Sequence, residues 1–380
     1  MTSSSPLVSI LMPTRNRWRH LRESLENTLA QTEKDREIII SDNHSQDETP
    51  DYLREMAARH PEIRLIRPPT PVGLYENHNF CVEHAQGAFL SFFQDHDLHD
   101  PEFLRLGRRF LEAHPQVGFV GAGWRLIDEE GRILGFRSER RNHCLKGVEF
   151  IDQTLREGRS PVAMAGALIR REALGPIRLG GALGFGDFLM WFRMAEQWQA
   201  GILGTVAWSW RQSTDAGSRV PILKMVEDYQ TNMDSYLREV SSRRPEWIAR
   251  VKGWRKKSAR FCRWALIYEI IQQSLPRLPA TGGTLFQMYG YRLEPAQLRM
   301  VEQKLDALNP TRLEEVIRKT AVLISGMKIL QFLPGYLLAQ TRFCRSLFLR
   351  LVEGDSLPAI LLTVKAANPA PDSKFGLPIP

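Results

Sequence analysis

Two hydrophobic periodicities alternate along the first half of the chain. Short apolar runs typical of buried strands are separated by longer segments whose apolar residues recur at helical spacing, such as Leu21, Leu25 and Leu29. This β-α-β-α-β order predicts an α/β fold, in which a mostly parallel twisted sheet is flanked by helices on both faces. The expected strands are residues 7–12, 36–42, 63–68 and 88–93, and the expected helices between them are residues 17–32, 50–60 and 73–86.

The pattern changes further along the chain. Up to residue 213 it predicts a helix, a hairpin, a strand that leads into a short helix, another helix and a last strand. These segments are residues 101–115, 117–132, 161–175, 187–199 and 201–213. Beyond residue 220 the strand pattern stops, and long helical segments follow at roughly 222–242, 246–274, 295–307, 310–332 and 336–353. We therefore predict two domains, an α/β domain at residues 1–220 and a basic, mainly helical domain at residues 221–380.

Composition places the chain among soluble globular proteins. Of its 380 residues, 43% are hydrophobic and 25% are charged, so disorder is not expected. The start of the chain lacks a basic region followed by an apolar run, so no secretory signal is expected. The four cysteines lie far apart without a C-x-x-C pair. This argues against a thiolate zinc site or a disulfide framework and fits a reducing cytosol.

The positive charge is concentrated in the second predicted domain. Residues 221–380 hold 24 Lys and Arg against 14 Asp and Glu, whereas residues 1–220 hold 27 against 29. This asymmetry favours an anionic partner, either a membrane surface or a nucleic acid. Basic residues with interleaved aromatics at 246–274 are typical of a helix at an anionic membrane interface. The most apolar stretch, residues 320–339, is interrupted by polar residues and is a poor spanning helix. A helical domain that packs its own core under a solvated basic face is the alternative.

Charged side chains directly follow the predicted strand at 88–93. Asp95 and Asp97 lie on either side of His96 in the segment FFQDHDLHDP. Carboxylate oxygens are the ligands that Mg2+ and Mn2+ prefer, usually one or two of them together with substrate phosphates. Asp42 ends another predicted strand, and ligands bind at the carboxyl ends of parallel strands. The segment is therefore either a metal site or simply a strand end that meets water.

Four stretches of the chain, in order, resemble the family 2 glycosyltransferases, which share the GT-A fold. They are VSILMPTRNR (8–17), EIIISDNHSQDET (37–49), NFCVEHAQGAFLSFFQDHDLHDPEFL (79–104) and GFGDFLMWFRMA (184–195). The resemblance covers roughly residues 7–215. It implies, in the same order, a nucleotide loop, an Asp that contacts the uracil or ribose, a metal-binding D-x-D segment and the segment of the catalytic base.

Carried over residue by residue, the resemblance implies a complete site. Asp187 is the expected catalytic base, although Asp at this position also suits a helix cap, and both roles are compatible. Asp97 and Asp95 are expected to hold Mn2+ or Mg2+. Residues from the strand ends and loops are expected to bind the nucleotide sugar: Pro13, Thr14, Arg15, Asp42, Arg67, Asp95, His96 and Arg211. Arg211 suits phosphate because a guanidinium offers a bidentate fork.

The chain departs from the family pattern at three positions. His96 stands where the first of two adjacent aspartates is usual, which makes Asp97 the stronger metal candidate. His96 is then an imidazole ligand or a nucleotide contact. Gly186 stands where Glu often precedes the base, and Ser213 stands where a His close to the diphosphate is often found. The last departure leaves a second protein ligand for the metal open.

The resemblance implies an inverting, metal-dependent glycosyltransferase of the hexosyltransferase type. We expect it to move a sugar from a nucleoside-diphosphate donor, with a UDP-sugar favoured, to a hydroxyl of a glycan or a lipid-linked acceptor. Such a reaction belongs to the synthesis of cell-surface polysaccharide or glycolipid. We expect a cytoplasmic protein, peripheral at the inner face of the cell membrane. The sequence does not specify the donor sugar, the nucleotide base, the acceptor, the linkage or the oligomeric state.

Two hypotheses from other classes stay open. The three departures suggest a non-catalytic GT-A-like subunit that docks to the membrane or to partners without turnover. The basic helices suggest nucleic-acid binding, but the chain has no known nucleic-acid module, so a nucleic acid is not an expected partner.

Overall fold

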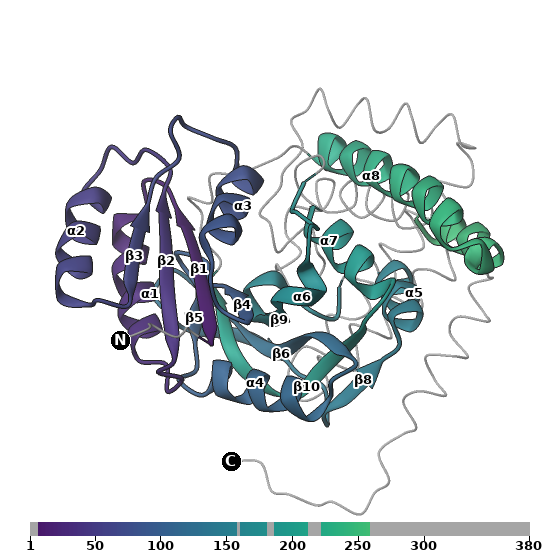
Figure 1. Ribbon diagram of the computed structural model, residues 1–380, viewed down its shortest axis with the longest axis horizontal. Helices are drawn as coiled ribbons and strands as arrows, with labels where there is room; N and C mark the ends of the chain where they lie inside the picture. The colour runs from purple at the N-terminus through teal and green to yellow at the C-terminus, as the bar shows by residue number, and fades with distance from the viewer. Residues whose placement is uncertain (1–6, 158–159, 181–185, 212–221, 259–380) are drawn as a thin grey trace, which may run out of the picture. The chain divides into compact units, whose positions relative to one another are not determined.

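The computed structural model describes residues 7–157, 160–180, 186–211 and 222–258, which are coloured in Figure 1. All of them belong to the first of two compact units. Ser213 and the helical segments predicted beyond residue 258 lie outside the described residues. The predicted division into domains at residue 220 therefore stays a prediction.

The first half of the chain builds parallel strands. Strands β1 (Val8–Thr14), β2 (Arg36–Asp42), β3 (Ile63–Ile66) and β4 (Phe89–Phe92) lie in the order β3-β2-β1-β4, and each pairs with its neighbour in parallel. Every residue of β1 and β2 is buried. Burial on both faces explains why the apolar residues at the centre of each strand, 10–12 in β1 and 38–40 in β2, are consecutive rather than alternating.

Three helices connect these strands. Helices α1 (Trp18–Leu29) and α2 (Thr49–Arg59) lie on one side of the first three strands in Figure 1, and α3 (Leu74–His84) lies on the other. Helix α1 buries Leu21 and Leu25, the positions that its helical spacing predicted. The predicted β-α-β-α-β order with helices on both faces is therefore confirmed for the first half of the chain.

The second half of the described chain adds shorter elements. They are β5 (Leu98–His99), α4 (Phe103–Ala113), β6 (Val117–Ile127), β7 (Ile133–Arg137), β8 (His143–Leu145), α5 (Gly147–Glu157), β9 (Ala167–Arg170), α6 (Arg171–Leu174), α7 (Gly186–Ala195), β10 (Gln199–Arg211) and α8 (Ile222–Arg243). The hairpin, the helices and the last strand lie where the sequence predicted them. The two-residue β5, the three-residue β8 and α5 were not predicted.

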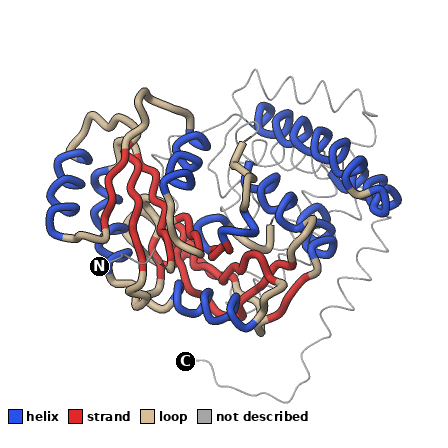
Figure 2. Tube along the Cα trace, viewed as in Figure 1, coloured by secondary structure: helices blue, strands red, loops and turns tan. Residues whose placement is uncertain are grey.

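These strands extend the sheet with mixed directions. Figure 2 shows the strands running through the middle of the molecule, with helices around them. Strand β9 is antiparallel to both β4 and β6, and β10 is parallel to β6 but antiparallel to β5. The result is one mixed sheet of ten strands in an α/β fold. In the β5–β10 pair, Leu98 lies opposite Ser209, which brings the end of β10 to the turn after β4.

Helix α8 packs on α7 within the same compact unit. The carboxylate of Glu196, just after α7, accepts two hydrogen bonds from Arg243, at 3.0 Å from Nε and 2.7 Å from Nη2. The rings of Phe192 and Tyr236 lie 5.3 Å apart between the two helices. Helix α7 is therefore held by a segment that follows β10.

Candidate functional site

The carboxyl ends of β1, β2 and β4 bring the predicted nucleotide residues together. Thr14 ends β1, and it lies opposite Asp42 at the end of β2. The Thr14 hydroxyl donates a hydrogen bond of 2.7 Å to Oδ2 of Asp95, which belongs to the turn after β4. Three strand ends therefore meet at Thr14, as the parallel order predicts.

The loops after β1 and β2 hold each other. Asn16 and His44 both adopt positive φ angles, of 51° and 58°. The backbone N–H of Asn16 donates to Oγ of Ser45 at 2.8 Å, and Oδ1 of Asn16 accepts from the backbone N–H of Gln46 at 2.7 Å. Asn and His tolerate the left-handed region better than bulky residues do. These loops form one fixed rim above the strand ends.

Asp42 and Arg67 face each other across this rim. Oδ1 of Asp42 accepts the backbone N–H of Ser45 at 3.0 Å, and its Oδ2 lies 4.0 Å from Nη1 of Arg67. Nη2 of Arg67 lies 3.0 Å from Nδ1 of His44. The structure thus brings Arg67 to Asp42, although their sequence positions gave no such pairing. Arg15, by contrast, is exposed.

His96 stands between the two aspartates of the turn. Its Nδ1 lies 2.9 Å from Oδ1 of Asp95, and its Nε2 lies 3.8 Å from Oδ1 of Asp97. Burial alone lowers the pKa of His96, but the carboxylates of Asp97 and Asp95 outweigh it and raise that pKa. Burial raises the pKa of Asp95, but His96, Arg17 and the Thr14 hydroxyl together lower it. Asp95 is therefore a carboxylate with both oxygens already engaged.

Asp97 is buried, and one of its two carboxylate oxygens has no partner among the described residues. Its Oδ1 accepts the backbone N–H of Arg211 at 3.0 Å. No described residue donates a hydrogen bond to its Oδ2. Burial raises the pKa of Asp97 to about 6, against the lowering effect of His96 and of the Arg211 N–H. A carboxylate with a free oxygen in such a place is a natural ligand for a cation, which would favour the ionised form.

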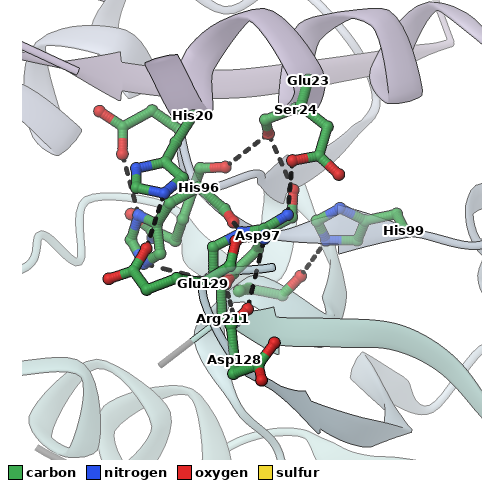
Figure 3. A network of polar contacts seen from close by, with 12 residues as sticks. His20, Glu23, Ser24, His96, Asp97, His99, Asp128, Glu129 and Arg211 are labelled. Atoms are coloured by element: carbon green, nitrogen blue, oxygen red, sulfur yellow. Dashed lines mark hydrogen bonds and ion pairs between the residues drawn. The ribbon is translucent and has the colours of Figure 1, made fainter. Parts of the chain in front are cut away.

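Helix α1 fixes the backbone of this turn. The Ser24 hydroxyl lies 2.9 Å from the carbonyl oxygen of Gln94 and 2.8 Å from that of Asp97, as Figure 3 shows for Ser24 and Asp97. The backbone N–H of His99 donates to Oδ1 of Asn27 at 2.6 Å. The side chain of His99 stacks on Phe93 with 3.5 Å between ring centroids. Burial lowers the pKa of His99 to about 4, so the ring is neutral and structural.

Arg211 ties four segments of the chain together (Figure 3). Its Nε donates to the carbonyl oxygen of His96 at 3.1 Å, and its Nη1 donates to that of Glu129 at 2.7 Å. Its Nη2 lies 2.6 Å from the carboxylate of Glu23 on α1. The fork predicted for phosphate is thus occupied by protein acceptors. A phosphate contact would require the guanidinium to leave these partners.

The predicted base lies in the first turn of α7. Asp187 is half-buried in the first turn of the helix, and burial raises its pKa to about 6, against the lowering effect of the Phe188 N–H. Tyr75 on α3 accepts the backbone N–H of Gly186 at 2.9 Å. Asn79, also on α3, makes two hydrogen bonds to the backbone of Leu179, of 2.7 and 3.0 Å. Helix α3 therefore anchors both sides of residues 181–185, which lie outside the described residues.

Side chains of the described residues do not form a complete metal site by themselves. Among the residues that the structure describes, no three His, Cys, Asp or Glu side chains are placed to hold a metal ion together. Asp97 offers its free Oδ2, and Asp95 is one residue away on the other side of His96. A cation at this turn would complete its coordination with phosphate or water oxygens, as Mg2+ usually does.

Several residues of the site had no signal in the sequence. Ser24 and Glu23 look like ordinary polar positions of a helix, and Glu129 looks like an ordinary turn residue. Asn77, which could have faced the pocket, instead pairs with Ser41 of β2 through hydrogen bonds of 2.6 and 3.2 Å. The pairing of β5 with β10, which rests on two residue pairs, brings Arg211 to the turn after β4.

Comparison with known protein families identifies the part of the chain that carries these strand ends. A family model described as glycosyl transferase family 2 matches residues 9–176. Residues 9–176 belong to glycosyl transferase family 2. This family 2 domain contains β1 to β9 and the turn at Asp95 and Asp97, while α7 and β10 follow it.

Two curated relatives are similar to about a third of this chain. EpsE of Bacillus subtilis (strain 168) is 35% identical over 130 residues, which are 34% of this chain and 47% of that protein. Chondroitin synthase of Escherichia coli is 30% identical over 129 residues, which are 34% of this chain and 19% of that protein. The chain spans less than half the length of each of these relatives.

A solved structure shares the fold. The structure of S. aureus TarS 1-349 in complex with UDP-GlcNAc has a TM-score of 0.53 with this chain and 14% sequence identity, and covers 82% of this chain and 86% of that one. At this identity the likeness concerns the fold alone, and it confirms the predicted GT-A fold for the family 2 domain. Within the described residues, no helix combines the length and the apolar character needed to cross a membrane.

Proposed function

We propose that this family 2 chain is an inverting, metal-dependent glycosyltransferase that uses a nucleoside-diphosphate sugar. One observation carries the proposal. The turn after β4 presents the free oxygen of Asp97 at the edge of the sheet, beside the loops after β1 and β2. A buried aspartate with one oxygen free of described partners suits a cation that neutralises a diphosphate leaving group.

The nucleoside would lie along the rim formed by the two loops. Asp42 and Arg67 meet there, and Pro13 and Thr14 end the strand below it. A carboxylate suits the N–H of a uracil ring or a ribose hydroxyl, and this is the role that the family resemblance gives to Asp42. The UDP-GlcNAc bound by TarS supports a UDP-sugar as the first donor to test.

A cation held by Asp97, with Asp95 beside it, would stabilise the negative charge that develops on the leaving diphosphate. The chain supports this turn with hydrogen bonds from Ser24 and from the N–H of Arg211. These contacts fix the carboxylate before the substrate arrives, so the site needs little rearrangement.

Asp187 would act as the general base. Its carboxylate would take the proton of the acceptor hydroxyl while the oxygen of that hydroxyl forms a bond to the anomeric carbon. The bond from that carbon to the phosphate oxygen breaks in the same step, and its electron pair leaves with the nucleoside diphosphate. Attack from the opposite face inverts the carbon. A pKa raised to about 6 leaves Asp187 ionised near neutral pH and basic enough to accept a proton.

The acceptor is a glycan or a lipid-linked molecule in this proposal. The similarity to chondroitin synthase supports a polysaccharide product. The described segment after α8 supports a membrane-side acceptor, since Arg250, Lys252, Arg255 and Lys256 are exposed while Trp254 is buried. A basic face of this kind suits the anionic inner face of the cell membrane, which would make the protein cytoplasmic and peripheral.

A donor screen tests the proposal. Purified protein is incubated with Mn2+ and a panel of UDP-, GDP- and dTDP-sugars, and release of the nucleoside diphosphate is measured with and without candidate acceptors. The proposal expects release with at least one donor and its loss in Asp187→Asn. Nucleotide binding without turnover, unchanged by Asp187→Asn, would instead favour the non-catalytic docking subunit.

A further inference from the structure

A diphosphate at the proposed site would also be stabilised by a positively charged side chain. The inference that follows rests on the proposed function. The sequence nominated three arginines for the nucleotide sugar. Arg67 lies beside Asp42 and His44, Arg15 is exposed on the loop after β1, and the guanidinium of Arg211 is occupied by Glu23 and by backbone carbonyls. Another arginine, Arg17, lies at the start of α1.

Arg17 carries a buried donor without a partner. Its Nη1 is buried and makes no hydrogen bond, and the side chain has no ion pair within the described part of the chain. Leaving a charged donor unpaired in a buried place costs free energy. Proteins rarely keep such a group unless a ligand or another partner satisfies it.

The charge of Arg17 acts on the candidate metal turn. It is among the groups that lower the pKa of Asp95, and it also lowers that of His96. The guanidinium therefore lies near the Asp95 and His96 side of the turn. Yet it forms no hydrogen bond with either residue, so its donors stay available on the Asp95 and His96 side of the turn.

The backbone around Arg17 is held firmly. The N–H groups on both sides are occupied, that of Asn16 by Ser45 at 2.8 Å and that of Trp18 by Asp47 at 3.2 Å. Arg17 occupies the N-cap position of the 12-residue helix α1, whose first turn holds no acidic residue. The start of a helix favours negative charge in a ligand. The side chain thus extends from a fixed backbone in a place that suits an anion.

We propose that Arg17 binds the diphosphate of the donor nucleotide. The buried Nη1 would donate to a phosphate oxygen, and the guanidinium would share the negative charge with the cation at Asp97. Phosphate suits this role because a guanidinium matches its oxygens with charge-assisted hydrogen bonds. Arg17, rather than Arg15 or Arg211, is then the arginine that distinguishes a diphosphate from a bare nucleoside.

The test compares a nucleotide with its nucleoside. UDP and uridine are each titrated by calorimetry into the full chain with Mn2+, for wild type, Arg17→Ala, Arg17→Lys and the matched exposed control Arg15→Ala. GDP with guanosine and dTDP with thymidine are run in the same way, and the pair that binds wild type most tightly is used. Nucleoside binding reports whether each variant keeps an intact pocket.

We expect Arg17→Ala to weaken diphosphate binding by roughly tenfold to a hundredfold, the usual cost of losing a charged hydrogen bond. Binding of the nucleoside should stay within about twofold, and Arg17→Lys should recover part of the loss because it keeps the charge without the fork. Equal weakening of nucleotide and nucleoside, or an unchanged nucleotide affinity, would overturn the role of Arg17 and leave the proposed function standing. Wild type that binds none of the three nucleotides would overturn both.

Discussion

Replacing Arg211 with alanine should destabilise the protein strongly. The side chain is only 2% exposed, and it bridges Glu23, the carbonyl oxygen of His96 and those of Asp128 and Glu129. Alanine would leave these acceptors without their donor. The substitution therefore tests whether Arg211 is a structural link, as its contacts indicate, or a residue reserved for phosphate.

The loss of unfolding free energy depends on which partners of Arg211 can form hydrogen bonds with water in the variant. The Glu23 side chain is 53% exposed, so its ion pair contributes about 0–1 kcal/mol. Each backbone acceptor left without a partner costs about 1 kcal/mol or more. The sum is about 3–5 kcal/mol of unfolding free energy, the range found when one partner of a buried pair is removed.

Urea unfolding followed by tryptophan fluorescence measures this cost. Glu23→Gln is the matched control, and it should lose no more than about 1 kcal/mol because its partner Arg211 keeps the carbonyl contacts. The reasoning is refuted if Arg211→Ala unfolds within about 1 kcal/mol of wild type. If that variant is stable and yet loses UDP binding, Arg211 is the phosphate ligand that the sequence suggested.

Three further predictions follow from the same contacts. The rate of sugar transfer should fall as pH drops through about 6, because Asp187 must be ionised to accept a proton; a profile that is flat down to pH ~5 would count against the base. Glu196→Ala should cost about 1–3 kcal/mol in urea unfolding, since it removes the carboxylate that holds Arg243; a cost near zero would show that α8 is held by other contacts. The double substitution Arg255→Glu and Lys256→Glu should weaken sedimentation with anionic vesicles by at least tenfold at low salt, at about 1 kcal/mol per charge; unchanged sedimentation would place the membrane contact elsewhere.

The periodicity of the chain predicted most of the fold in its first half. Strands β1 and β2 are buried on both faces, so each has a run of consecutive apolar residues at its centre, 10–12 and 38–40, that stands out from the flanking helices. The shorter elements could not be predicted in this way. Strand β5 has two residues and β8 has three, too few for a period to be seen.

The sequence predicted only those parts of the candidate site that lie at the ends of parallel strands. Thr14, Asp42 and Asp95 meet because three parallel strands end at one edge. The role of Arg211 depends instead on β10 passing beside the turn after β4, an antiparallel pairing that no local pattern reveals. A sequence shows that an arginine is charged, but the fold decides which acceptors surround it.

The same limit applies to Arg17. In the sequence it is one of two arginines on the loop after β1, and the family resemblance directs attention to Arg15. Only the structure shows that Arg15 is exposed, whereas Nη1 of Arg17 is buried without a partner. Burial and hydrogen bonding, rather than residue type, therefore select the candidate for the phosphate.

The central claim is that the turn at Asp97 binds a cation together with a diphosphate. Calorimetric titration of UDP, GDP and dTDP with and without Mn2+, for wild type and Asp97→Ala, tests it most directly. The account predicts that one of these nucleotides binds wild type only when Mn2+ is present, and that Asp97→Ala removes the effect of the metal. Nucleotide binding that is the same with and without Mn2+, and unchanged in Asp97→Ala, would contradict it.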